Sequence, residues 1–349
     1  MAAPPPPKPA RGRRLAFPVV VAVLSCLLLE GVLVGVRRLP ALSAAPPVAG
    51  LARELYQLDR PILQYEPEMA RWDAELGYTL RPGSFRFAAT EFDTRITANS
   101  LGLRGDEAAL VAPEIVVLGD SFAMGWGVED GETFPALLQT ITGRRVLNGG
   151  MSSWGTGRQL RLLGRLDLSA ARWVVLQFGA NDWQENRIFV HGGDAVRPQD
   201  ESAYRETVRA YLAGRRYWPG RYAVTLLGRR LGLVTTDDEA LPDFDDPAIR
   251  HEQVAQLLEL LRRAAPLLTG RRLVVLELNP HNRQSDWFIP LLEETVARRT
   301  DLPAAVADLV AVDVASLLGR EHFYRLDDHL RPCGHAVVAE RIAEVVASP

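Results

Sequence analysis

The chain has 349 residues, of which 47% are hydrophobic and 24% are charged, and its formal net charge is -3. This composition is typical of one globular domain of roughly 250 residues with additional segments, and the net charge gives no reason to expect nucleic acid as a partner. The only lysine is Lys8. A lysine nucleophile, a pyridoxal Schiff base and a P-loop are therefore excluded from the folded domain, and we expect no cofactor and no metal.

The first feature along the chain is an apolar segment of about 22 residues, Leu15 to Val36, which is long enough to cross a bilayer. Four basic residues precede it and two follow it, so the positive-inside rule places the N-terminus in the cytoplasm. We expect residues 1–14 to form a cytoplasmic tail, residues 15–36 a single-pass signal anchor in the membrane, and the rest to lie on the periplasmic or extracytoplasmic side. The alternative is a cleaved signal peptide with a cut site at Ser43 to Ala45.

Residues 37–98 are expected to form a linker and an accessory hairpin. Pro40 to Val48 reads PALSAAPPV, a composition typical of a semi-extended linker. Ser84 to Ser100 alternates apolar and polar residues, which predicts a hairpin. The segment NSLGLRG follows at Asn99 to Gly105, and for its Arg104 we expect a structural salt bridge rather than a place in an active site.

Three apolar runs then end in small polar residues. Ile115 to Gly127 reads IVVLGDSFAMGWG, Arg145 to Gly150 reads RVLNGG, and Trp173 to Asp182 reads WVVLQFGAND. Short β-branched runs of this kind predict buried strands, and the carboxyl ends of parallel strands are where α/β sheets bind ligands. Ser121, directly after the first run, is therefore a candidate nucleophile, with the N-cap of a helix as the alternative interpretation.

The segment 183–248 is an insertion relative to a minimal doubly wound fold. It contains aromatic residues and arginines at Tyr211 to Tyr222 and an acidic run at Asp237 to Asp246. Because it follows a strand end, one hypothesis is a lid in which Tyr217 or Trp218 stacks on a sugar or acyl group of the substrate. The alternative is a helical hairpin on the surface.

Further strands are predicted at Arg272 to Asn279 and Leu309 to Val314, with helices at Glu252 to Leu268 and Phe288 to Arg299. The chain then has about five parallel strands with helices on both faces. We predict an α/β fold, a three-layer α/β/α sandwich of flavodoxin-like winding.

Near the C-terminus, Leu326 to His329 reads LDDH and is followed by a helical stretch. With the three strand ends, this fourth block makes the chain resemble the SGNH hydrolases, also called the GDSL esterase family. We expect residues 99–349 to form the hydrolase domain, with 183–248 as the insertion. The resemblance covers Asn99 to Val346 and implies the flavodoxin-like sandwich and an esterase activity. The lead-in NSLGLRG resembles a bacterial envelope-associated subset of this family.

The resemblance implies a catalytic triad, and physical chemistry supports the same residues. A serine hydroxyl is a weak nucleophile until a base takes its proton, so Ser121 needs an imidazole, and His329 is the best placed by motif. Asp327 can orient that imidazole. Family members often have the aspartate three residues before the histidine, where this chain has Leu326, so Asp328 stays as the alternative to Asp327.

The resemblance also implies an oxyanion hole. Its donors, carried over by position, are the backbone N–H groups of Ser121 and Gly150 and the side-chain amide of Asn181. One departure from the family lies close by, since a glycine common after the second block is Ser153 here.

The sequence therefore predicts a membrane-anchored serine esterase. Its expected substrate is an acylated carbohydrate or small ester, with an O-acetyl ester on an envelope or exported glycan as the specific expectation. An O-acyltransferase that moves the acyl group to a glycan hydroxyl is the first alternative, and a non-catalytic glycan-binding envelope protein is the second. The sequence does not predict the oligomeric state.

Overall fold

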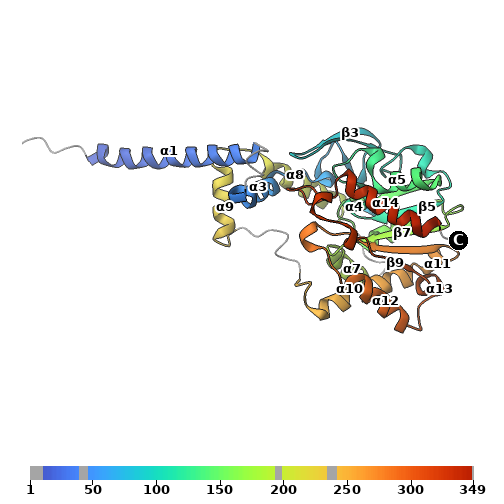
Figure 1. Cartoon of the computed structure of the whole chain (residues 1–349). Helices are drawn as coiled ribbons and strands as arrows, with labels where there is room; N and C mark the ends of the chain where they lie inside the picture. The colour runs from blue at the N-terminus through green and yellow to red at the C-terminus, as the bar shows by residue number, and fades with distance from the viewer. Residues whose placement is uncertain (1–10, 39–45, 193–198, 234–241, 348–349) are drawn as a thin grey trace, which may run out of the picture. The chain divides into compact units, whose positions relative to one another are not determined.

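The computed structural model of the chain describes residues 11–38, 46–192, 199–233 and 242–347 (Figure 1). These residues divide into two compact units: Met1–Asp59 with Arg215–Ala240, and Arg60–Gly214 with Leu241–Pro349. We call the first the helical unit and the second the sheet unit. Lys8, residues 40–45 of the predicted linker and residues 237–241 of the acidic run lie outside the described residues.

A five-stranded parallel sheet forms the centre of the sheet unit. Its strands are β5 (Ile115–Gly119), β6 (Val146–Gly150), β7 (Trp173–Phe178), β8 (Arg272–Glu277) and β9 (Val310–Val312). They are ordered β6-β5-β7-β8-β9, with every neighbouring pair parallel. The order changes direction at β5, so the carboxyl ends of β5, β6 and β7 lie together. The predicted α/β fold with about five parallel strands is confirmed.

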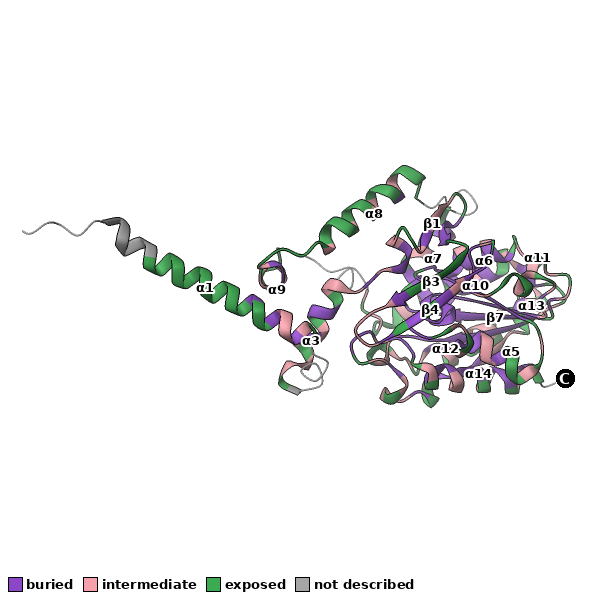
Figure 2. Ribbon diagram, turned by 90° about the horizontal axis from the view of Figure 1, so that it is seen from above, coloured by how far each residue is buried: buried purple, intermediate pink, exposed green. Residues whose placement is uncertain are grey.

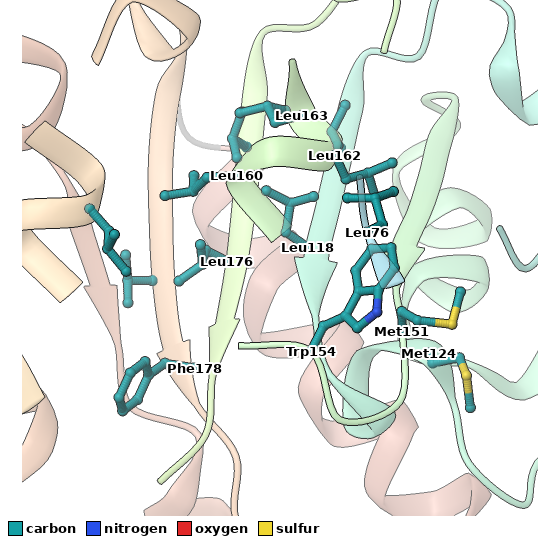
Figure 3. Packing of buried hydrophobic residues seen from close by; sticks show 14 of the residues in the cluster. Leu76, Leu118, Met124, Met151, Trp154, Leu160, Leu162, Leu163, Leu176 and Phe178 are labelled. Atoms are coloured by element: carbon teal, nitrogen blue, oxygen red, sulfur yellow. The ribbon is translucent and has the colours of Figure 1, made fainter. Parts of the chain in front are cut away.

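The two faces of the sheet bury different residues because side chains alternate along a strand. On one face, Leu118 of β5 and Leu176 of β7 pack with Leu160 of α6 (Thr156–Leu163), as Figure 3 shows. On the other face, Val117 and Val175 pack in a second cluster. β5, β6 and β7 are buried along their whole length, which explains the nearly continuous apolar sequences of β5 and β7.

Helices cover both faces and complete the three layers. The first face carries α6, α7 (Asp182–Gly192), α10 (Pro247–Arg263) and α12 (Phe288–Arg298), together with the short α11 (Ala265–Leu268) and α13 (Ala304–Ala307). The second face carries α5 (Phe134–Thr142) and α14 (Pro332–Ala347), which pack against each other. The predicted three-layer α/β/α sandwich is therefore present (Figures 1 and 2).

Two antiparallel hairpins precede the sheet in the chain. β1 (Ala70–Asp73) pairs with β2 (Gly77–Leu80), and β3 (Gly83–Ala88) pairs with β4 (Asp93–Ala98). The second hairpin is the one predicted from the alternating residues. Arg104 follows it and is structural, as expected, because its buried guanidinium binds Asp130 Oδ1 at 2.8 Å and the carbonyl oxygen of Val128 at 2.6 Å.

The helical unit contains α1 (Arg11–Arg38), α3 (Pro46–Asp59) and α9 (Arg221–Arg230). Phe17–Arg38 is long and apolar enough to cross a membrane, with a mean hydropathy of 2.6. The linker prediction is wrong at its C-terminal end, because residues 46–48 form the first turn of α3. Proline is tolerated there, since the backbone N–H that it lacks would have no hydrogen-bond partner in the first turn of a helix. The insertion is helical, with α7, α8 (Glu201–Arg215) and α9.

The buried Arg104 generates a stability prediction. Arg104→Leu leaves the carbonyl oxygen of Val128 without its donor and Asp130 without its ion pair, so we expect the free energy of unfolding to fall by about 3 kcal/mol in urea denaturation. Arg86→Leu is the matched control, because its ion pair with Asp93 is exposed to solvent and should leave the stability unchanged. Equal effects of the two substitutions would contradict the structural role of Arg104.

Candidate active site

The turn from β5 into the short helix α4 (Ser121–Met124) positions Ser121. Asp120 is the N-cap of α4 and accepts a hydrogen bond from the N–H of Phe122 at 2.8 Å. The N–H of Asp120 donates to the buried side chain of Gln177 on β7 at 3.0 Å. Ser121 thus begins a helix directly at the carboxyl end of the sheet, so the N-cap function in this turn belongs to Asp120 and not to the serine.

Ser121, His329 and Asp327 come together in the sheet unit although 208 residues separate the serine from the histidine. Ser121 Oγ lies 2.8 Å from His329 Nε2, and His329 Nδ1 hydrogen-bonds to Asp327. The Asp327 side chain is completely buried. A carboxylate on Nδ1 favours the tautomer whose Nε2 accepts the proton of the hydroxyl group.

Asp328, the alternative acid, does not contact the imidazole in this way. It has a left-handed φ of 65° and forms an ion pair with Arg320 at 3.5 Å. Consecutive residues on this tight turn point their carboxylates to different partners. The geometry therefore selects Asp327 over Asp328 as the partner of His329.

Glu91, from the loop between β3 and β4, holds the loop that carries Asp327. Its carboxylate accepts three consecutive backbone N–H groups, from Arg325 at 2.9 Å, Leu326 at 2.7 Å and Asp327 at 3.1 Å. Three donors on one carboxylate fix the backbone just before the histidine. The accessory hairpin thereby contributes directly to the site geometry, a role that its sequence does not indicate.

Trp126 and Arg60 form a second layer behind the imidazole. The indole of Trp126 stacks on the ring of His329 with centroids 5.0 Å apart and an interplanar angle of 16°. The guanidinium of Arg60 lies 4.9 Å from the centre of the indole, and its Nε is 3.7 Å from Asp327 Oδ2. The cation offsets the charge of the buried carboxylate and, with the indole, restricts the position of the imidazole.

The three predicted oxyanion donors lie at the ends of β5, β6 and β7, and their role stays a prediction. The N–H of Gly150 donates to Asn148 Oδ1 at 3.0 Å within the same strand end. The side chain of Asn181 hydrogen-bonds to Asp120, next to Ser121, and its amide has a second N–H. The N–H of Ser121 lies at the first turn of α4.

Ser153 occupies the place where the family commonly has glycine, and its backbone explains that preference. Its φ is 59°, a left-handed conformation that is uncommon for residues with a Cβ. The neighbouring backbone is held by Tyr78, whose hydroxyl donates to the carbonyl oxygen of Ser152 at 2.7 Å, and Gln64 donates to Ser153 Oγ at 3.1 Å. The loop after β6 therefore keeps the glycine conformation with a serine.

Tyr217 and Trp218 belong to the helical unit and not to the sheet unit that contains Ser121. Their contact with substrate therefore stays a prediction. Both side chains are about half exposed. Among the described residues, no group of three or more His, Cys, Asp or Glu side chains is placed to hold a metal ion.

The sequence matches the GDSL-like lipase/acylhydrolase family over residues 117–337, which include Ser121, Asn181 and the whole LDDH block. The chain belongs to this family. Membership supports a hydrolase of ester bonds, and the resemblance stated from the four sequence blocks is confirmed. No curated protein matches the sequence.

The solved structures that match this chain share little sequence with it. A lipolytic protein of the G-D-S-L family from Desulfitobacterium hafniense is 12% identical with a TM-score of 0.37, and the match covers 66% of this chain and 98% of the other. A carbohydrate esterase family 2 enzyme from Corynascus thermopiles is 16% identical with a TM-score of 0.37, and the match covers 71% of this chain and 69% of that enzyme. Phospholipase A1 from Streptomyces albidoflavus is 16% identical with a TM-score of 0.36, and the match covers 68% of this chain and 99% of the phospholipase.

Two buried carboxyl groups, at the starts of α4 and α7, have raised pKa values. Burial raises the pKa of Asp120 to about 6, against the opposing effect of the hydrogen bond from the N–H of Phe122 and the attraction of His329. Burial, together with the nearby Asp120, raises the pKa of Asp182 well above its ordinary value. Both groups therefore favour their neutral forms more than exposed aspartates do.

The raised pKa of Asp120 predicts a pH-dependent stability. The stabilisation by its neutral form is complete below pH 3.8, the ordinary value, and is lost as the pH rises through about 6. Asp120→Asn keeps a capping side chain without the charge. Between pH 4 and pH 7, wild type should lose about 2 kcal/mol of unfolding free energy relative to this variant, measured by urea denaturation in detergent. A difference that does not change with pH would contradict the buried, weakly acidic Asp120.

Proposed function

We propose that the chain is a serine esterase that removes an O-acyl group, specifically acetyl, from an envelope or exported glycan. The observation that carries the catalytic part is the 2.8 Å distance between Ser121 Oγ and His329 Nε2, with Asp327 on the other ring nitrogen. The lead-in segment before β5, which resembles that of envelope-associated family members, supports the glycan as substrate.

The proposed reaction follows from these contacts. His329 Nε2 takes the proton of Ser121 Oγ as the oxygen attacks the acyl carbon, and the carbonyl electron pair moves to oxygen. The oxyanion is stabilised by the backbone N–H groups of Ser121 and Gly150 and by the second amide N–H of Asn181. The tetrahedral intermediate then collapses, and the alkoxide leaves with the proton from His329. In the second half, His329 takes a proton from water as the water attacks the acyl-enzyme. Collapse of the second intermediate releases the acid and returns the proton to Ser121 Oγ.

The same residues can carry out acyl transfer when a sugar hydroxyl replaces water in the second half. The transferase and the hydrolase differ only in the acceptor that reaches the acyl-enzyme. The non-catalytic alternative, a glycan-binding envelope protein, is disfavoured by the complete hydrogen-bonded set of Ser121, His329 and Asp327.

The proposed location is the membrane, with the sheet unit on the periplasmic or extracytoplasmic side. The apolar length of Phe17–Arg38 and the exposure of most of its side chains support an anchor. The larger number of basic residues before the helix than after it supports a cytoplasmic N-terminus.

The first test compares the full chain in detergent with Ser121→Ala. We expect p-nitrophenyl acetate turnover to fall about a thousand-fold or more, because no other nucleophile in the turn replaces the hydroxyl group. Acetylated xylan and a free sugar acceptor are assayed in parallel. Release of free acetate supports the esterase, and transfer of acetate mainly to sugar supports the transferase. Turnover that does not depend on Ser121 in a folded protein contradicts both.

A second test separates the two adjacent aspartates. Asp327→Asn should lower kcat by roughly a thousand-fold to ten-thousand-fold, because the amide favours the wrong imidazole tautomer. Asp328→Asn is the matched control, since asparagine tolerates the left-handed backbone at this position. It should keep kcat within about threefold of wild type. The reverse ranking of the two variants would show that the acid of the triad is Asp328.

A further inference from the structure

Helix α9 of the helical unit exposes an apolar face. Val224, Leu227 and Leu231 follow the i, i+3, i+7 spacing of one helix face and are 57%, 59% and 62% exposed, and Leu233 just beyond is 76% exposed. Four large apolar side chains exposed side by side on a short segment are unusual for a surface in water. The opposite side of this helix carries Tyr222, which is buried.

α9 is docked on α1 through a carboxylate within the apolar span. Glu30 is only 3% exposed, and its two carboxylate oxygens accept the backbone N–H groups of Tyr222 at 3.2 Å and Ala223 at 3.1 Å. These N–H groups belong to the first turn of α9, whose N-cap, Gly220, has no side chain to satisfy them. The charge of Glu30 and the amino-terminal dipole of α9 thus compensate each other.

The direction of α9 differs from that of α1. In Figures 1 and 2, α9 extends away from α1 near the C-terminal end of α1, in a direction across the axis of α1 and not along it. If α1 spans the bilayer, a helix that crosses it at this level lies in the plane of the membrane surface. An amphipathic helix in that plane places its apolar face in the boundary between headgroups and acyl chains.

The residues around α9 are those typical of a membrane interface. Tyr217 and Trp218, just before α9, are 51% and 46% exposed, and aromatic residues of this kind concentrate at the level of the headgroups. Arg216 and Arg230 are exposed at either end of the helix, and Arg38 is exposed at the end of α1. Their guanidinium groups suit the phosphates of lipid headgroups.

We propose that α9 is a second membrane contact of this chain, an interfacial helix whose Val224, Leu227 and Leu231 enter the acyl boundary of the lipid bilayer. The partner of this surface is lipid, because α9 contacts α1 at Glu30, within the apolar span whose exposed side chains are themselves expected to face lipid. The inference rests on the proposed anchoring by α1. It also gives Tyr217 and Trp218 a role at the headgroup level in place of the stacking on substrate that the sequence predicts.

The test uses the full chain in vesicles of phosphatidylcholine and phosphatidylglycerol, with Cys26→Ser and Cys333→Ser as background. An environment-sensitive fluorophore is attached after Leu227→Cys, and a duplicate after Leu231→Cys covers the case in which one substitution impairs folding. Lipids with a nitroxide near the headgroup serve as quenchers. We expect each label on α9 to lose about half of its fluorescence or more.

Two further labels give the controls. Ile141 in α5 of the sheet unit is 51% exposed, similar to Leu227 and Leu231, so a label attached after Ile141→Cys is a matched control. This label should not be quenched. Leu24→Cys in α1 reports the anchor through lipids with a nitroxide deep in the acyl chain. If the label on α1 is quenched and the labels on α9 are not, the membrane contact of α9 is overturned, whereas the anchoring by α1 is supported. A label on α9 that is shielded from water but not quenched shows a protein partner and overturns it as well. Unquenched labels on both helices overturn the anchor itself.

Discussion

The absence of side chains at two glycines is the constraint on which the candidate active site depends. A Cβ on Gly119 would lie 2.5 Å from Gln177 Oε1, the atom that accepts the N–H of Asp120. A Cβ on Gly150 would lie 2.6 Å from the backbone carbon of Ala123 in α4. Both distances are too short for non-bonded atoms, so α4 can approach the end of the sheet only when both positions are glycine. Ser121 reaches His329 because of this close approach.

The same constraint gives Gly150 a second reason to be glycine. The family resemblance implies an oxyanion donor at this position, which glycine suits because it lets the backbone come close to a ligand. In the structure the close approach is to α4, and the N–H is used by Asn148. A sequence indicates that a glycine is needed, but it does not show which neighbour requires it or where the N–H points.

Much of the fold and the triad could be predicted because the information is local. Strand runs such as Ile115 to Gly119 are short apolar patterns that predict a buried strand from adjacent residues alone. The LDDH block is a short motif too, and it is recognised by its resemblance to the family. Glu91, Trp126 and Arg60 could not be predicted, because each acts through contacts with residues that are distant in the sequence. Glu30 was visible only as a polar exception in an apolar segment, and its meaning depends on the packing of α9 against α1.

Arg60 is the first residue of the sheet unit and is joined by a peptide bond to Asp59, the last residue of α3. Its guanidinium is 3.7 Å from the carboxylate that orients His329. A fragment of the chain cut at the boundary between the units would therefore begin with a new α-ammonium group on this residue. The extra charge would lie on the residue whose guanidinium offsets the charge of Asp327, so a water-soluble fragment intended for enzymology should start within α3, for example at Arg53.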